Sequence, residues 1–145
     1  MKKILILLSF LCVLVPTYAS SPGDMLYGKW KVVAILDSAR MVSSSEAFAK
    51  QGIGQYLIIT PKEIRFRKEI GLSPIFNKSK QDTFDYFYSV NGFRMDPTNL
   101  RLPEIVTEIM IDYENVISVY AIYIKNKNSI VFFWRGYFYK AIRSK

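Results

Sequence analysis

Hydrophobic and polar residues alternate with a period of two along most of this chain, a pattern that predicts β-strands. In the segment from Gly28 to Leu36, for example, Trp30 and Val32 fall on one face and Lys31 falls on the other. Segments of this kind predict strands over residues 28–36, 55–60, 63–68, 83–90, 105–113, 116–124, 129–135 and 137–143.

Local signals predict a hairpin between the second and third of these strands, and one helix before them. Pro61 fixes its own φ angle and therefore suits the hairpin turn. Ser43 and Glu46 match a capping box, with Ser43 as the N-cap, and Gly52 suits the end of the helix. The segments without a regular pattern are predicted to be loops over residues 71–82 and 92–103.

These elements predict an all-β fold, a small eight-stranded antiparallel barrel with one short helix in its N-terminal half. No helix lies between successive strands to make a parallel crossover, and eight strands can close without leaving a free edge. A sandwich of two sheets with the helix at one end is the alternative. Residues 20–145 are expected to form a single domain, because no repeat or linker interrupts them.

The first nineteen residues have the pattern of a bacterial-type signal peptide. Lys2 and Lys3 precede an apolar stretch over residues 4–15, and Ala19 ends a small-x-small cleavage signature. As a helix, that stretch would span only about 18 Å, against a hydrocarbon core of about 30 Å. We therefore expect cleavage after Ala19, no membrane span in the remaining chain, and a location in the periplasm or the medium.

Composition removes several classes of enzyme and metal site. The chain has no histidine, and its single cysteine, Cys12, lies inside the predicted signal peptide. A Ser-His-Asp triad, a Cys-His pair, a Cys/His zinc site and a disulfide are therefore excluded from residues 20–145. The close carboxylate pairs, such as Glu108 and Asp112, fall on polar faces of strands. We expect no enzyme activity, no cofactor and no metal.

The start of the first predicted strand resembles a motif of the lipocalins and the wider calycin group. Gly28-Lys29-Trp30 resembles their Gly-x-Trp motif, and residues 112–115 and 133–135 resemble their late Asp-Tyr turn and arginine segment. In that family the tryptophan closes one end of an eight-stranded barrel, and an arginine from a late strand packs over it. The resemblance implies structural roles for Gly28, for Trp30 and for one of Arg135 and Arg143.

Tyrosines on the predicted strands raise the question of a small ligand. Tyr86 and Tyr88 share one face of the segment 83–90, and Tyr120 lies on a later strand. Such side chains would offer a bound molecule apolar area and hydroxyl donors. The alternative is a filled core, because bulky aromatic side chains can occupy the whole interior of a small barrel.

The long loop over residues 92–103 is the first candidate for contact with a protein. Phe93, Arg94, Met95 and Arg101 are residues of the types that are enriched in protein interfaces. The alternative is that this loop forms a lid over one end of the barrel.

A basic run on the strand 63–68 is the second candidate. Arg65 and Arg67 are predicted to point outward, which suits a charged sheet edge or an acidic partner. Nucleic acid is not expected as a partner, because Phe66 between them faces inward and so offers no stacking surface.

We therefore predict a non-catalytic binding protein outside the cytoplasm. The first hypothesis is an envelope inhibitor or immunity protein that binds another protein, such as an acidic-faced enzyme or toxin. The second hypothesis is a lipocalin-like carrier or sensor of a small hydrophobic ligand. The abundance of aromatic residues favours the first, because they leave little room inside a barrel.

Overall fold

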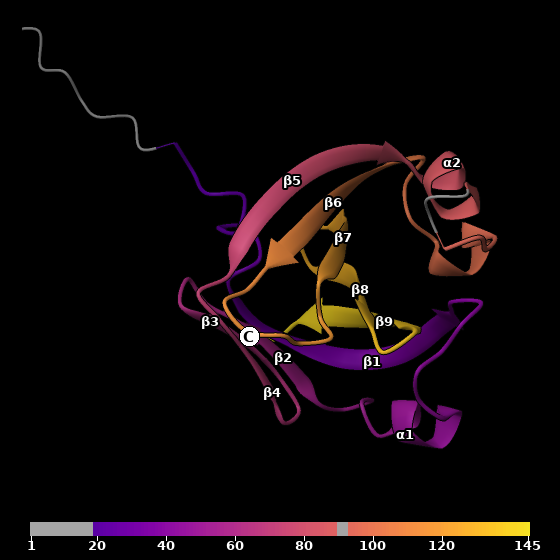
Figure 1. Ribbon diagram of the computed structural model, residues 1–145. Helices are drawn as coiled ribbons and strands as arrows, with labels where there is room; N and C mark the ends of the chain where they lie inside the picture. The colour runs from indigo at the N-terminus through magenta and orange to yellow at the C-terminus, as the bar shows by residue number, and fades with distance from the viewer. Residues whose placement is uncertain (1–18, 90–92) are drawn as a thin grey trace, which may run out of the picture.

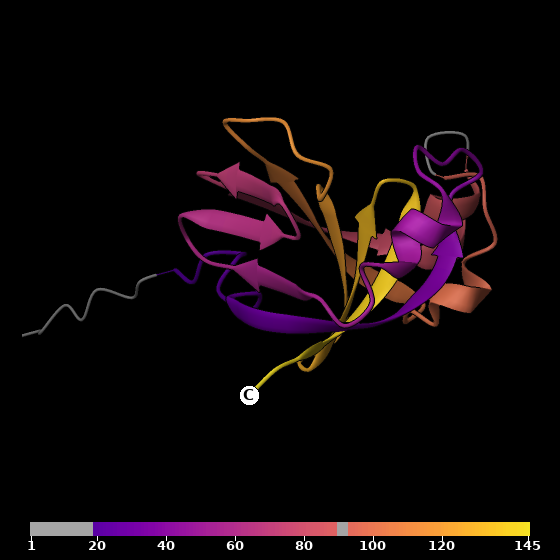
Figure 2. The ribbon, with the colours of Figure 1, turned by 90° about the horizontal axis from the view of Figure 1, so that it is seen from below.

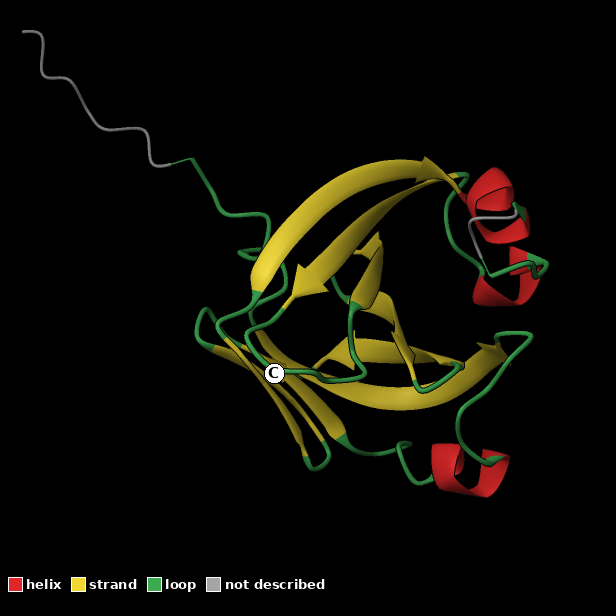
Figure 3. Ribbon diagram, in the orientation of Figure 1, coloured by secondary structure: helices red, strands yellow, loops and turns green. Residues whose placement is uncertain are grey.

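The computed structural model describes residues 19–89 and 93–145, so the predicted signal peptide, apart from Ala19, lies outside the described residues. Within these described residues, nine strands form one antiparallel sheet in the order β4-β3-β2-β1-β9-β8-β7-β6-β5 (Figure 1). Short helices lie at its periphery (Figure 3). The strands are β1 (Gly28–Ser38), β2 (Tyr56–Ile59), β3 (Glu63–Phe66), β4 (Glu69–Leu72), β5 (Ile75–Asp82), β6 (Ile105–Asp112), β7 (Ala121–Asn126), β8 (Ser129–Trp134) and β9 (Tyr137–Arg143), and the helices are α1 (Glu46–Lys50), α2 (Thr83–Tyr88) and the 3-10 helix η1 (Pro97–Leu100).

The sheet is strongly curled, so that β5 and β6 arch over β1 (Figures 1 and 2). Its concave face encloses an inner core, in which Leu57 of β2 and Ile122 of β7 belong to one buried cluster. Phe66 packs edge-to-face on Phe132 and Trp134, with ring centroids 5.1 and 5.0 Å apart. The all-β prediction is confirmed, and large aromatic side chains occupy the interior of the curl.

The predicted eight-stranded closed barrel differs from the observed nine-stranded open sheet. The two edge strands, β4 and β5, follow each other in the chain but do not pair. The loop over residues 113–120 covers the edge of β4 instead. Asn115 accepts a hydrogen bond from the Leu72 N–H at 2.8 Å and donates one to the Ile70 carbonyl at 2.6 Å. One side-chain amide thus satisfies edge groups that a neighbouring strand would satisfy in a closed barrel.

An outer core covers the convex face of the central strands, so that every residue of β8 is buried. Phe133 of β8, Phe138 of β9 and Phe87 of α2 belong to this second cluster. The predicted strand over residues 83–90 is therefore wrong, since residues 83–88 form α2. The Asp82 side chain accepts a hydrogen bond from the Asp85 N–H at 3.0 Å, and this N-cap begins a helix.

Other boundaries also differ from the predictions. Residues 71–82, predicted as a loop, contain β5, which lacks hydrophobic alternation because it is an exposed edge strand. Helix α1 has Ser45, not Ser43, as its N-cap, and the Ser45 hydroxyl accepts a hydrogen bond from the Phe48 N–H at 3.2 Å. The strand predicted at 116–124 begins only at residue 121, because residues 113–120 form the loop that covers β4.

Candidate functional site

A groove of about 650 Å³ opens on the convex side of the sheet, next to the outer core. It brings together the segment that follows β1, the segment after the end of α2, the residue before β7, and β8. We call it the arginine groove, and it is lined by Ala39, Arg40, Met41, Phe93, Arg94, Tyr120 and Phe133.

Three aromatic side chains form the floor of the arginine groove. The Phe93 ring lies 4.8 Å from the Phe133 ring and 4.9 Å from the Phe138 ring, measured between centroids. Tyr120 packs edge-to-face on Phe133 at 5.4 Å. Because Phe138 and its neighbours are buried and closely packed, they restrict the movement of the aromatic side chains that form the floor.

Arg40 and Arg94 are exposed at the groove, and so is Met41, which is 87% exposed. Within residues 19–89 and 93–145, no carboxylate lies within salt-bridge distance of either guanidinium. Arg94 also has a positive φ of 52°, a backbone conformation that costs energy for any residue except glycine. The groove therefore combines apolar area with two positive charges that are free to pair with an acidic group.

The structure divides residues 93–103 of the predicted contact loop into two parts, and Gly92 lies outside the described residues. Phe93 and Met95 pack against the outer core, so this part is a lid, but over the convex face of the sheet and not over a barrel end. Arg94 points its charge to the groove, whereas Arg101 caps η1 and lines a different hollow, beside Thr83. Only Phe93 and Arg94 of the predicted contact residues therefore meet in the arginine groove.

The two arginines of the predicted basic run also separate. Arg65 is exposed on β3 and pairs with Glu63 at 2.6 Å, as predicted for a charged strand face. Arg67 does not point outward with it, because Arg67 lies in the turn after β3 with a φ of 56°. Its guanidinium lies over the Phe48 ring, 4.5 Å from the centroid, and donates to the Phe48 carbonyl at 3.2 Å.

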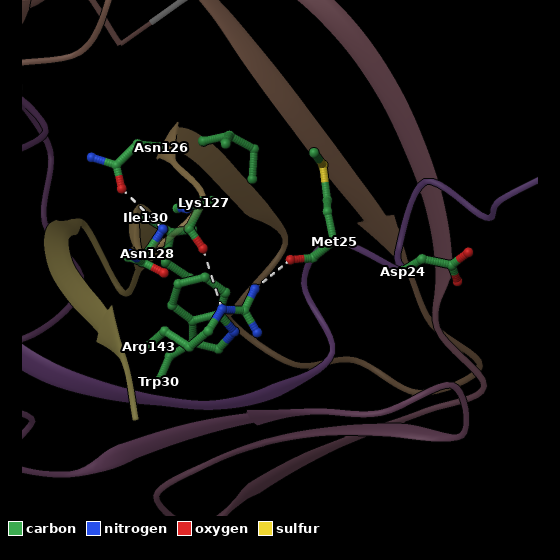
Figure 4. Close-up of a pocket in the computed structure, with 9 residues that line it drawn as sticks. Asp24, Met25, Trp30, Asn126, Lys127, Asn128, Ile130 and Arg143 are labelled. Carbon is green, nitrogen blue, oxygen red and sulfur yellow. Dashed lines mark hydrogen bonds between the residues drawn. The ribbon is translucent and has the colours of Figure 1, made fainter. Parts of the chain in front are cut away.

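A second pocket, of about 480 Å³, lies at the other end of the inner core. Figure 4 shows Arg143 against Trp30, between the β7–β8 turn and Met25. The Arg143 guanidinium lies 4.1 Å above the Trp30 ring and donates to the carbonyls of Met25, Tyr27 and Lys127. It thereby ties the chain before β1 to the barrel-like sheet.

Of the two arginines that the family resemblance offered as partners of Trp30, Arg143 lies over the ring, and Gly28 lies beside it. A Cβ atom at Gly28 would lie 3.4 Å from the guanidinium, and Gly28 has a φ of 127°. Arg135 lies elsewhere, in the β8–β9 turn, where it pairs with Glu69 at 2.8 Å.

The predicted cavity tyrosines do not line the concave interior. Tyr86 and Tyr88 lie on α2, and Tyr88 is an exposed residue that stacks on Phe84 at 5.2 Å. Tyr120 lines the arginine groove instead. The strand prediction for residues 83–90 caused this error, because a helix sends these side chains in other directions.

Tyr86 belongs to a buried polar cluster between α2 and β6. Its hydroxyl donates to the Glu108 carboxylate at 2.5 Å, and Ser79 and Gln81 also donate to that carboxylate. Glu108 was predicted to lie on a solvated strand face, but it is buried beneath α2. Burial, followed by the hydrogen bond to Glu108, raises the pKa of Tyr86 well above its usual range. Glu108 therefore acts as an acceptor that holds α2 on the sheet.

Comparison of the chain with protein-family models, with curated proteins and with solved structures finds no match. Across the described part of the chain, no helix is long and apolar enough to cross a membrane. Among the same residues, no three Asp, Glu, Cys or His side chains gather as a metal site would require. The lipocalin resemblance and the absence of catalysis remain predictions.

Sequence reasoning missed four residues of the arginine groove, Ala39, Arg40, Met41 and Phe133. Arg40 and Met41 lie between the first strand and the first helix, a short stretch without a pattern of its own. Phe133 was noted only as part of the family resemblance. A run of Ala, Arg and Met at the end of a strand is too common to indicate a site, and only the curl of the sheet brings it beside Phe93.

Proposed function

We propose that this protein is a non-catalytic binding protein whose partner is another protein, and that the arginine groove receives an acidic, partly apolar segment of that partner. One observation carries this proposal. Two exposed arginines, Arg40 and Arg94, flank an aromatic floor, and within the described residues neither has an acidic partner. Aromatic and arginine side chains are the residues that most often dominate protein interfaces.

The charge of the groove indicates the chemistry of the partner. A carboxylate between the two guanidinium groups would form charge-assisted hydrogen bonds, and an adjacent apolar side chain would cover Phe93 and Tyr120. The chain has a net charge of +8, or +6 without Lys2 and Lys3 of the predicted signal peptide, and this positive charge speeds the approach of an acidic surface. The backbone strain at Arg94 supports a functional role, because strained residues concentrate at binding sites.

We further propose that the partner is an acidic-faced enzyme or toxin of the cell envelope and that this protein is its inhibitor or immunity protein. The signal peptide predicted over residues 1–19 supports a location in the periplasm or the medium. Such a role needs a rigid scaffold and a complementary surface, and no catalytic group.

A lipocalin-like carrier of a small hydrophobic ligand is the second candidate. The pocket between Trp30, Met25 and Ile124 favours it, because about 480 Å³ lies within the range of small-molecule sites. Against this candidate, the donor groups of Arg143 are already engaged by three carbonyls, and aromatic side chains fill the interior beyond Trp30.

Site-specific photo-cross-linking in the cells that produce the protein tests the proposed function. A benzophenone amino acid replaces Met41, at the groove, or Tyr56, which is exposed on β2 and serves as the control position. We expect one discrete protein adduct from position 41, none from position 56, and loss of the adduct when Arg40→Gln and Arg94→Gln are added.

Equal adducts from both positions, or an adduct at position 41 that survives both arginine substitutions, would contradict the proposed function. The two substitutions should leave the urea midpoint of the protein unchanged, since both side chains are exposed and neither forms an ion pair with another described residue. Loss of the adduct therefore reports loss of recognition and not loss of the fold.

A further inference from the structure

A groove of about 520 Å³ lies between the second half of β1 and α1 (Figure 1). We call it the β1 groove, and it is lined by residues 33–38 of β1 and by Glu46, Lys50, Ile53 and Tyr137. It shares no lining residue with the arginine groove or with the pocket beside Trp30. The β1 groove is therefore a separate candidate for a binding site.

The wall that β1 contributes to this groove is a free strand edge. β2 pairs with β1 only as far as Lys31, and the chain just before β2 adds two hydrogen bonds to Val32, at 2.9 and 2.8 Å. Beyond Val32, no strand in the described part of the chain pairs with this edge, although β9 pairs with the other edge as far as Ser38. A free edge of this kind can pair with a strand from another chain.

The hydrogen bonds of β9 show which main-chain groups of β1 point to the free edge. The Arg143 N–H donates to Asn128, next to β8, at 2.9 Å. Residues two apart on an antiparallel strand bond to the same neighbour, so Tyr139 also bonds to β8 and not to β1. Ile35 is directly opposite Tyr139. The N–H and C=O of Ile35 therefore point away from β9, toward the groove.

Two of the apolar side chains that line the β1 groove are well exposed. Val33 of β1 is 37% exposed, and Ile53, which follows α1, is 43% exposed. A partner that covered both side chains would remove from water apolar area that folding leaves exposed. We therefore expect apolar side chains in the occupant of the groove.

The lining of the β1 groove also has one net negative charge. Asp37 accepts hydrogen bonds from the Ser38 N–H at 2.8 Å and from the Asn99 amide at 2.9 Å. Among the described residues, no lysine or arginine lies within salt-bridge distance of its carboxylate. Glu46 and Lys50 pair with each other at 2.8 Å, so their charges cancel. The charge of Asp37 is thus left to pair with a basic group of the occupant.

We propose that the β1 groove binds an extended, basic segment of another protein, which adds to the free edge of β1 as a strand. Its main chain pairs with Ile35, its apolar side chains cover Val33 and Ile53, and a lysine or arginine pairs with Asp37. A small apolar molecule would leave the main-chain groups of Ile35 and the Asp37 carboxylate without partners. The proposal does not rest on the arginine groove, for which the proposed partner segment is acidic.

NMR titration of the isotope-labelled protein with two capped hexapeptides tests the site. One peptide alternates valine with lysine, and the other alternates valine with glutamate. We expect the lysine peptide to shift the Ile35 amide signal and to bind about tenfold more tightly than the glutamate peptide. Because the protein has a positive net charge, non-specific attraction would favour the glutamate peptide instead.

Substitutions separate this site from the rest of the surface. Asp37→Asn should weaken binding of the lysine peptide about fivefold, because the peptide loses its ion pair. The matched control is Asp85→Asn, which removes an exposed carboxylate from α2 and should change binding less than about twofold. The variant with Arg40→Gln and Arg94→Gln should bind the lysine peptide as the unmodified protein does, so failure of one proposal is distinguishable from failure of the other.

A lysine peptide that is methylated at its main-chain nitrogens tests the strand pairing itself. It keeps the side chains but cannot donate main-chain hydrogen bonds, so we expect it not to bind. Equal binding of the methylated peptide or of the glutamate peptide would overturn the proposal. Signal shifts confined to residues outside β1, or binding of neither unmethylated peptide, would overturn it too.

Discussion

Removal of the Glu69 carboxylate should destabilise the protein more than removal of an exposed ion pair. Glu69 holds the edge strand β4 to two neighbouring segments. Glu69 lies on the edge strand β4, and its carboxylate accepts hydrogen bonds from the Ser118 N–H at 2.8 Å and from the Ser118 hydroxyl at 3.2 Å. It also accepts two from the Arg135 guanidinium, at 2.9 and 2.8 Å. One side chain therefore ties β4 to the covering loop and to the β8–β9 turn.

The expected loss for Glu69→Ala follows from these contacts. The Glu69 side chain is 16% exposed, so the bonds from Ser118 are largely shielded from water and should contribute about 1.5 kcal/mol. The pair with Arg135, whose side chain is 40% exposed, should add about 1 kcal/mol because it is bidentate. We expect Glu69→Ala to lower the free energy of unfolding by about 2–3 kcal/mol.

Urea denaturation followed by tryptophan fluorescence measures this loss. With a slope of about 1.5 kcal/mol per molar, typical of a small domain, the midpoint should fall by about 1.3–2 M. Glu63→Ala is the matched control on the neighbouring strand, because within the described part of the chain Glu63 pairs with Arg65 alone, and the Arg65 side chain is 52% exposed. We expect that control to lose less than about 0.5 kcal/mol.

The difference should also depend on pH. Burial alone raises the pKa of Glu69, but the hydrogen bonds from Ser118 and Arg135 outweigh it and hold the pKa below the model-peptide value of 4.5. The contribution of Glu69 is therefore complete above that value and disappears as the pH falls through the folded-state pKa. Equal midpoint losses for Glu69→Ala and Glu63→Ala at pH 7, or a difference that grows at pH 3, would refute the reasoning.

Three further substitutions test other parts of the structure by the same urea assay. Arg143→Ala should cost about 2 kcal/mol of unfolding free energy, because three carbonyls lose their donor and the Trp30 ring loses its cation. Arg143→Lys should recover less than half of that loss. Full recovery by lysine would show that charge alone matters. Tyr86→Phe should cost about 1–3 kcal/mol by leaving a buried carboxylate without its shortest bond. Tyr123→Phe should cost less, because among the described residues the Tyr123 hydroxyl has no partner of good hydrogen-bond geometry, and the reverse order would disprove the assigned hydrogen bonds. Gly71→Ala should cost about 2–3 kcal/mol, because the new Cβ would lie 2.3 Å from Tyr113 Cε1, and an unchanged midpoint would mean that the covering loop does not pack on β4.

Local pattern was enough to predict the elements whose two faces differ. The hairpin of β2 and β3 was predicted because Leu57 and Ile59 alternate with outward-facing residues around Pro61. The same reasoning failed for α2, where aromatic residues with high strand propensity lie on a helix. The decisive signal there is Asp82 as N-cap, with Thr83 and Phe87 one turn apart, and it is weaker than the propensity of the residues between them.

The site could be predicted only in part, because it depends on contacts between distant segments. Phe93 and Arg94 were singled out from residue type, but Arg40 and Met41 join them only through the curl of the sheet. The sequence pattern also failed to predict the edge strands. The polar sequence of β5 resembles that of a loop. The edge of β4 is covered by the side-chain amide of Asn115, a single residue that no sequence pattern distinguishes.

Native mass spectrometry of the protein, purified gently from the envelope fraction of its own cells, tests the central claim most directly. We predict a complex with one other protein, and its absence when Arg40 and Arg94 are both replaced by glutamine. A mass excess of a few hundred daltons without a protein partner would indicate the carrier function instead. That result, or a complex that survives both substitutions, would contradict the assignment of the arginine groove as the recognition site.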